Sequence, residues 1–189
     1  MNRRQTLATL AAGTASALGA PAFAAPSKDE KRAEVRKMAQ ETLGKLYSVQ
    51  PSAKKAIESS AGYAVFSNFG MKILVAGGGS GDGVAVNTKT KAETFMSMVE
   101  VQAGLGMGIK KFRLVWVFEQ AALLQKFVSS GWEFGAQATA AAQTGGTGAS
   151  YQGAVAVSPG VWLYQLTGDG LAAELTVKST KYYKNKDLN

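Results

Sequence analysis

Cysteine and histidine are both missing from the 189-residue chain. Without cysteine the chain can form no disulfide, offers no thiol nucleophile, and cannot carry the lipid anchor that bacterial lipoproteins attach to a cysteine. Zinc sites and Ser-His-Asp triads also depend on the missing residues. A large part of enzyme chemistry is therefore excluded, and we predict neither a metal nor another cofactor.

Long apolar runs are also missing beyond the N-terminus, where no segment approaches the ~20 residues that a membrane span needs. At the N-terminus, Arg3 and Arg4 precede a weakly apolar stretch over 6–20 and a small-x-small site at 22–24. This pattern predicts a secretory signal peptide over 1–24, exported by the twin-arginine or the ordinary Sec route. We then expect one domain over 25–189, periplasmic or secreted, and soluble or at most peripheral.

Acidic residues are few beside basic ones: 13 against 21, with a net charge of +8. The charge falls by two units when Arg3 and Arg4 leave with the signal peptide. A moderate positive excess favours partners that carry phosphate, although in an exported protein it can serve solubility alone. We expect no nucleic-acid partner in that compartment.

Two helices are predicted at the start of the mature chain. Ser27 and Glu30 have capping-box spacing, and the apolar residues that follow recur at helical intervals to about residue 47. This amphipathic helix either packs on the core or lies in a lipid interface. A short second helix begins at Ser52 and ends near Gly62.

From residue 63 the chain is rich in β-formers, broken by one apolar helical face over 119–130. Strands are predicted at 63–69, 73–76, 84–86, 94–101, 104–110, 114–118, 133–142, 154–157, 161–165 and 172–177. We therefore predict an α+β fold: a single β-rich domain of mostly antiparallel, strongly curved sheet, barrel- or sandwich-like, with an N-terminal helical segment and one internal helix.

Glycine alternates at Gly77, Gly79, Gly81 and Gly83, and again at 104, 106 and 108. We interpret the first run as the join of a hairpin between the strands around it. A row of glycine on one strand face implies close approach by another backbone, tight curvature or a bulge. The alternative, a phosphate-cradling loop, lacks the spacing of the known nucleotide motifs.

Several segments of the chain resemble the motifs of a known domain family, and they occur in the same order over most of the chain. Residues 62–67 (GYAVFS) resemble a "gvaVFP" strand, 78–84 (GGSGDGV) a "GgsyGeGv" hairpin, and 104–108 (GLGMG) a "G.qiG" strand. Residues 115–118 with 123–127 resemble a "vlvF…aL..F" strand–helix step. Three later pieces follow in the same order: 134–138, 163–175 and the pair Tyr182-Tyr183.

This order resembles the SYLF domain family, also called the DUF500 or actin-binding type. Two departures, Ser67 in place of a proline and a lost glycine near Val177, fall at strand ends. The resemblance implies a β-rich lipid-binding domain. In eukaryotic relatives the ligands are phosphoinositides, engaged by basic residues and an N-terminal amphipathic helix, and some fungal relatives bind actin. For an exported bacterial member we expect anionic phospholipid headgroups instead, and we do not expect actin.

Peripheral lipid binding needs a cluster of cations, because each contributes only about 1 kcal/mol at an anionic surface. The purest cluster is Lys110, Lys111 and Arg113, which we place between two strands with Phe112 among the cations. Further candidates are Lys54 and Lys55 on the second helix, a tail cluster over 178–186, and the cations of the first helix: Lys31, Arg32, Arg36 and Lys37. Any one of these clusters can instead be an ordinary solvated face.

Two other classes of function remain open. The first class is an enzyme, because seven scattered acids could supply a catalytic carboxylate pair. Nothing in the sequence brings two of these acids together, so we predict no catalytic residue and no enzyme. The seven acids are Asp82, Glu93, Glu100, Glu119, Glu133, Asp169 and Glu174. The alternative to lipid binding is an envelope structural or protein-interaction module. The three tryptophans lie in strand patterns and are expected in the core.

Overall fold

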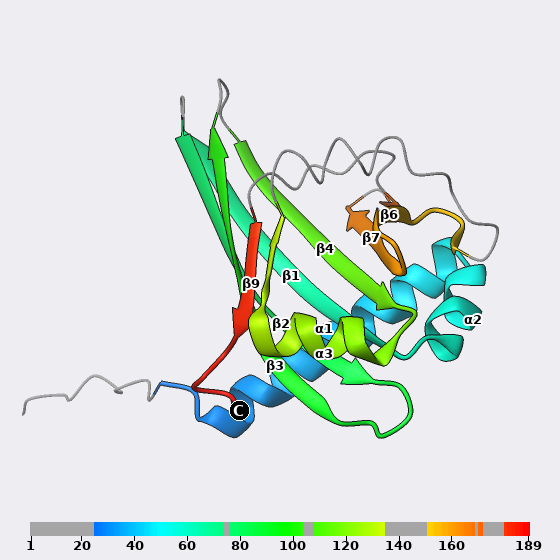
Figure 1. Cartoon of the computed structure of the whole chain (residues 1–189). Helices are drawn as coiled ribbons and strands as arrows, with labels where there is room; N and C mark the ends of the chain where they lie inside the picture. Colours follow the sequence, from blue (N-terminus) through cyan, green and yellow to red (C-terminus); the bar gives the residue numbers. More distant parts are fainter. Residues whose placement is uncertain (1–24, 74–75, 104–107, 135–150, 169, 172–179) are drawn as a thin grey trace, which may run out of the picture.

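The computed structural model describes residues 25–73, 76–103, 108–134, 151–168, 170–171 and 180–189. Three helices lie in these segments: α1 (Lys28–Val49), α2 (Ser52–Ser59) and α3 (Ala121–Ser130) (Figure 1). The strands are β1 (Gly62–Ile73), β2 (Ala76–Asn87), β3 (Glu93–Ala103), β4 (Gly108–Phe118), β5 (Trp132–Phe134), β6 (Val155–Ser158), β7 (Val161–Thr167), β8 (Gly170–Leu171) and β9 (Thr180–Lys184).

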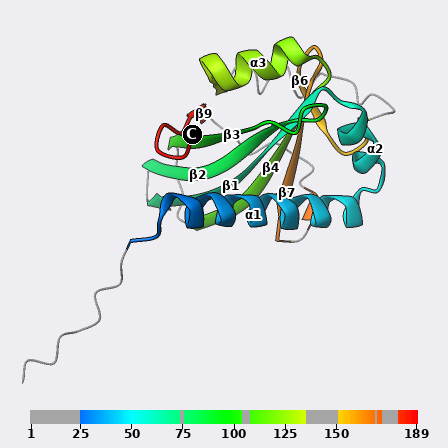
Figure 2. The same cartoon turned by 90° about the horizontal axis from the view of Figure 1, so that it is seen from below.

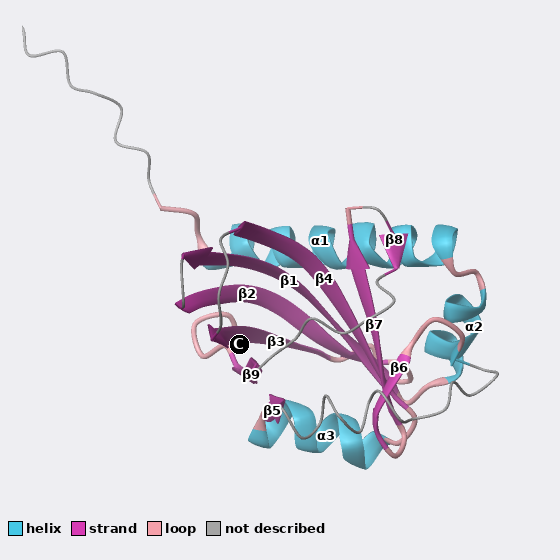
Figure 3. Cartoon of the chain, turned by 90° about the horizontal axis from the view of Figure 1, so that it is seen from above, coloured by secondary structure: helices cyan, strands magenta, loops and turns pink. Residues whose placement is uncertain are grey.

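All nine described strands belong to one sheet, in the order β5-β9-β3-β2-β1-β4-β7-β6, with β8 paired to β7. Every described pairing is antiparallel. The sheet curves strongly into a half-barrel (Figure 3). This confirms the predicted α+β class and, of the two predicted shapes, favours the barrel.

Helices cover the sheet on both sides, with α1 against one face and α3 against the other (Figure 2). We call these the α1 face and the α3 face. The α1 face packs Val65, Val84, Val115 and Tyr164 against the helix. The α3 face buries an aromatic cluster built around Trp116.

Helix α1 begins as predicted, because the Ser27 hydroxyl accepts from the Glu30 amide and the Glu30 carboxylate accepts from the Ser27 amide. Its buried stripe is Val35, Ala39, Thr42 and Leu46, which lies against the sheet. The apolar side of the helix is therefore used in the core, which answers the question that the sequence left open. No helix in the described part of the chain is both long and apolar enough to cross a bilayer.

The other predicted helices are also present. Helix α2 starts at Ser52, and α3 ends at Gly131, whose φ of 72° explains why glycine stands there. Leu124 and Phe127 of α3 are buried against the α3 face, next to Tyr182, whose pKa is raised by its complete burial.

The glycine run is not the join of a hairpin, as predicted, but lies inside β2. Strands β1 and β2 pair from Gly62 with Asn87 to Ile73 with Ala76, so the connection falls at 74–75. A Cβ on Gly81 would lie 1.8 Å from the Ser67 carbonyl oxygen, and one on Gly83 would lie 2.3 Å from Phe66. Close approach by the neighbouring strand, one of the predicted reasons, explains both glycines.

The stretch from 110 to 113 is not a connection between two strands. It lies within β4, which runs without a break from Gly108 to Phe118 and pairs with β1 along its length. Strand β9, at the Tyr182-Tyr183 pair, was not predicted as a strand. The predicted signal peptide over 1–24 and the strand segments over 104–107, 135–142 and 172–177 lie outside the described residues.

Replacing Gly81 with alanine should destabilise the fold, because the added methyl group would collide with the backbone of β1. We expect the free energy of unfolding in urea to fall by about 1–3 kcal/mol. The matched control is Gly78→Ala in the same strand, where the new Cβ would lie 3.5 Å from the Glu100 carbonyl oxygen, an ordinary contact. Equal losses in both variants would contradict this account of β2.

Candidate functional site

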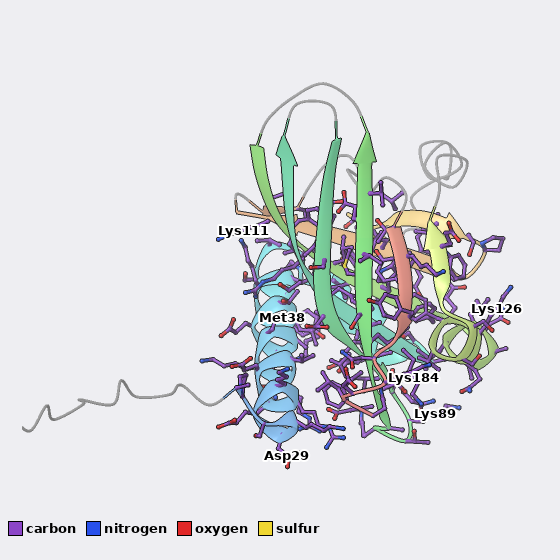
Figure 4. The ribbon with its side chains drawn as sticks, turned by 90° about the vertical axis from the view of Figure 1, so that its left-hand side faces the viewer. Asp29, Met38, Lys89, Lys111, Lys126 and Lys184 are labelled. Atoms are coloured by element: carbon purple, nitrogen blue, oxygen red, sulfur yellow. The ribbon has the colours of Figure 1, made fainter. Side chains whose placement is uncertain are left out.

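A basic pocket of about 550 Å³ lies where the C-terminal half of α1 crosses β1, β4 and the end of β7. Three cations line it from separate elements: Lys45 from α1, and Lys111 and Arg113 from β4. The other polar residues of the wall are Ser67 and Asn68 of β1 and Thr167 at the end of β7, with Gly168 directly after the strand. Figure 4 shows Lys111 beside this end of α1, opposite to Asp29 at the start of the helix.

Strand alternation gathers the two β4 cations on one face. Lys111 and Arg113 are two residues apart in a continuous strand, so both point to the α1 face, as do Val115 and Val117 further along. Phe112 points the other way and is 4% exposed within the core of the α3 face. Phe112, the aromatic between the cations in the sequence, therefore supports the strand from the core of the α3 face.

Arg113 is held by α1. Its guanidinium donates to the Thr42 hydroxyl at 3.1 Å and lies 3.5 Å from the Glu41 carboxylate. Thr42 belongs to the buried stripe of the helix, and Glu41 is the exposed residue directly before it. Because the Arg113–Glu41 pair is long and exposed, it contributes little binding energy and leaves the guanidinium available to an anion.

Lys45 reaches from α1 to the far wall of the pocket. Its ammonium donates to the carbonyl oxygens of Thr167 at 2.8 Å and Gly168 at 3.0 Å. These two bonds fix the end of β7 against the helix while the charge stays at the rim. Lys45 was not among the predicted site residues, because it is an isolated cation in the sequence. Its position three residues after the buried Thr42 is the signal that could have found it.

A second pocket, of about 420 Å³, continues along the same flank of α1 toward the N-terminus of the helix. The two pockets share Ser67 as a wall residue. The second pocket is acidic, since Glu34 and Asp82 line it. The Asp82 carboxylate accepts from the Ser97 hydroxyl at 2.8 Å. The flank of α1 thus changes sign along its length, and of these two pockets the one at Lys45 suits an anion.

The other predicted cations do not line the basic pocket. Lys110 lies in β4, but its side chain is outside the described residues. Lys54 and Lys55 are exposed on α2. Lys37 is exposed on α1.

Lys31 and Arg32 lie near the start of α1, which for Lys31 is about 21 Å along the helix axis from Lys45. The Arg32 guanidinium donates to the Leu188 carbonyl oxygen at 2.8 Å and pairs with Asp29 at 3.1 Å. Its neighbour Arg36 pairs with Glu93 at 2.8 Å, and that hydrogen bond raises the pKa of Arg36. The arginines of this half of the helix serve the fold.

The acids considered for catalysis are dispersed in the described part of the chain. Glu93 pairs with Arg36, and Glu119 accepts from the Trp162 indole at 2.9 Å. Glu100 is 2% exposed on the α3 face, where it accepts a hydrogen bond from the Asn68 side-chain amide. Asp169 and Glu174 lie outside the described residues. No group of three or more acids that could hold a metal ion occurs among the described residues.

The tryptophans differ in burial. Trp116 is fully buried, as predicted, whereas Trp132 and Trp162 are half-buried. Trp162 stacks on Tyr151 with ring centroids 4.5 Å apart.

Comparison with known proteins identifies one curated relative. The chain is 33% identical over 164 residues to Beta cell expansion factor A of Aeromonas veronii, an alignment that covers 84% of this chain. The chain spans 59% of the length of that relative. No family model matches the sequence.

Replacing Lys45 with methionine keeps most of its aliphatic stem but removes the donors to Thr167 and Gly168. We expect faster amide hydrogen exchange at the end of β7 and in β8, and a loss of about 1 kcal/mol of unfolding free energy, because the lost bonds are charge-assisted but lie at the surface. Lys37→Met, at an exposed site of the same helix, is the control. Unchanged exchange in Lys45→Met would show that the lysine does not hold this wall.

Proposed function

We propose that the chain is a SYLF-type domain that binds anionic phospholipid headgroups as a peripheral protein of the periplasm. The observation that carries the proposal is the convergence of Lys45, Lys111 and Arg113 on one pocket from elements far apart in the sequence. The ordered motifs of the resemblance, and a fold of the predicted β-rich class, support the same family.

The chemistry of the pocket suits a phosphate group. Arg113 offers a planar fork of donors, Lys111 adds a compact charge, and Lys45 adds a charge that its bonds to Thr167 and Gly168 hold at the wall. Among the described residues, the Glu41 carboxylate lies 3.5 Å from the Arg113 guanidinium, at the edge of the cation cluster. At about 1 kcal/mol for each cation near an anionic surface, the cluster supplies weak and reversible binding.

The predicted signal peptide and the basic pocket together support a peripheral location at the membrane. The predicted signal peptide over 1–24 would deliver the domain to the periplasm or beyond, where anionic phospholipid is present in the membrane surface. The basic pocket would then hold the domain at that surface by charge, a mode that salt weakens within a Debye length.

The proposal is tested by co-sedimentation of the protein with vesicles of graded anionic phospholipid content. Lys45→Gln, Lys111→Gln and Arg113→Gln combined should weaken binding on the order of 100-fold, because about 3 kcal/mol of attraction is lost. The matched control removes three cations elsewhere, Lys89, Lys126 and Lys184, which lie away from Lys111 in Figure 4. It has the same net charge as the pocket variant.

Equal weakening in both variants would mean that net charge alone attracts the protein, and would contradict a defined pocket. Binding that does not depend on the anionic content, or that resists high salt, would favour the alternative of an envelope protein-interaction module.

Glu41→Gln tests whether a negative charge beside the pocket weakens binding to anionic vesicles. Removing this carboxylate from the edge of the pocket should strengthen binding to anionic vesicles about fivefold, the equivalent of about 1 kcal/mol. Glu58→Gln, an exposed acid on α2, is the control for the change in net charge. Weaker binding of Glu41→Gln, titrated against the same vesicles, would mean that the carboxylate orients Arg113 rather than competing with the anion.

A further inference from the structure

Exposed apolar side chains collect on the α1 face of the sheet, beyond the edge of the helix. Val99, Val101 and Tyr183 are 40%, 65% and 41% exposed, and they lie on the neighbouring strands β3 and β9. Ser97 pairs directly with Tyr183, so alternation along β3 places all three on one face. We call these three residues the valine patch. The fourth large apolar residue exposed in the described chain, Val49, lies apart at the end of α1.

The valine patch shares its face of the sheet with the basic pocket. The ladder pairs Val99 with Ser80, Ser80 with Phe69, and Phe69 with Lys111, so Val99 and Lys111 stand in one row across the sheet. Three strand spacings separate them, about 14 Å along the sheet. Figures 1 and 4 show the strands of this region continuing past α1, so the helix covers only part of the face.

Cations stand on both sides of the apolar centre. Lys181 of β9 pairs directly with Val99 and is exposed, and Lys111 ends the row on the other side. On its other side Lys181 pairs directly with the acid Glu133 of β5. From β9 to β4 the row runs Lys181, Val99, Ser80, Phe69 and Lys111. With a cation at each end and a valine between them, it can meet headgroups at its ends and acyl chains at Val99.

We infer that the valine patch enters the apolar part of an anionic leaflet while the basic pocket binds its headgroups, so that the open α1 face of the sheet, and not helix α1, lies on the membrane. The inference rests on the proposed function and adds the orientation of the domain. Helix α1 is not available for insertion, because its buried stripe packs against the sheet.

Charge argues for a leaflet rather than a second copy of the chain. In a two-fold symmetric pair the same patch faces itself, so Lys111 and Lys181 of both copies would be brought close together. An anionic leaflet offers the opposite charge to Lys111 and Lys181 and apolar depth at the valines, whereas the acids Glu34 and Asp82 line the neighbouring pocket that Tyr183 also borders. The two valines supply the apolar contact that charge alone lacks.

The absence of cysteine allows a direct test. Val101→Cys, labelled with an environment-sensitive NBD fluorophore, is mixed with anionic vesicles, and co-sedimentation is measured on the same samples. The emission should shift to the blue and be quenched by nitroxide-labelled acyl chains. Val49→Cys with the same label is the control, an exposed valine on α1 (43% against 65% for Val101), and its emission should stay that of a label in water.

A second variant requires no label. Val99→Ser and Val101→Ser combined should bind anionic vesicles about tenfold more weakly than the native chain, whereas Val49→Ser should bind as the native chain does. Circular dichroism and urea unfolding of each variant establish that it is folded.

Three results would overturn the inference. If the protein sediments with vesicles but the label at position 101 remains in water, the orientation is wrong and the proposed function stands. If the emission shifts with rising protein concentration and no vesicles, the patch pairs two copies of the chain. If no protein sediments with the vesicles, the proposed function and this inference fail together.

Discussion

The packing of helix α1 across one face of the curved sheet is the contact on which the rest of the structure depends. Its buried stripe covers only part of the strands, because the helix crosses them and does not follow them. One flank of the helix therefore borders open sheet. At the border of this packing contact Arg113 donates to Thr42, and Lys45 donates to Thr167. The residues at the border of the core therefore also form the wall of the pocket.

Strand alternation explains why the pocket is basic. In β4 the same short stretch sends Phe112 into the core and Lys111 and Arg113 to the α1 face. Burial of Phe112 fixes the register of the strand, since a slip of one residue would put the cations in the core. The aromatic side chain thus positions the charges through the backbone, although it does not touch an anion itself.

The elements that could be predicted are those with a strong local signal. The capping box at Ser27, the start of α2 at Ser52 and the glycine that ends α3 were each visible in the sequence, and so was the β-rich class. The hairpin was misplaced because glycine usually marks a turn. Gly81 and Gly83 are required instead by the close approach of strand β1, and the spacing of residues in the sequence does not reveal which strand will be the neighbour.

The pocket could be predicted only in part. Lys111 and Arg113 belong to a visible cluster, but Lys45 is distant in the chain and joins them only through the crossing of α1 and β4. Lys31, Arg32 and Lys37 were equally visible and do not line the pocket: Lys31 and Arg32 lie near the other end of the long helix, and Lys37 is exposed at its middle. Charge patterns along a sequence identify candidates, and tertiary contacts select among them.

We propose above all that the domain meets an anionic bilayer with the open α1 face of its sheet. Nuclear magnetic resonance of the protein on anionic bicelles that contain a gadolinium-chelating lipid tests it most directly. The account predicts the strongest relaxation enhancement at the amides of 97–101, 111–113 and 181–183. Enhancement concentrated on α3, or on the outer side of α1 around Lys37, would contradict it.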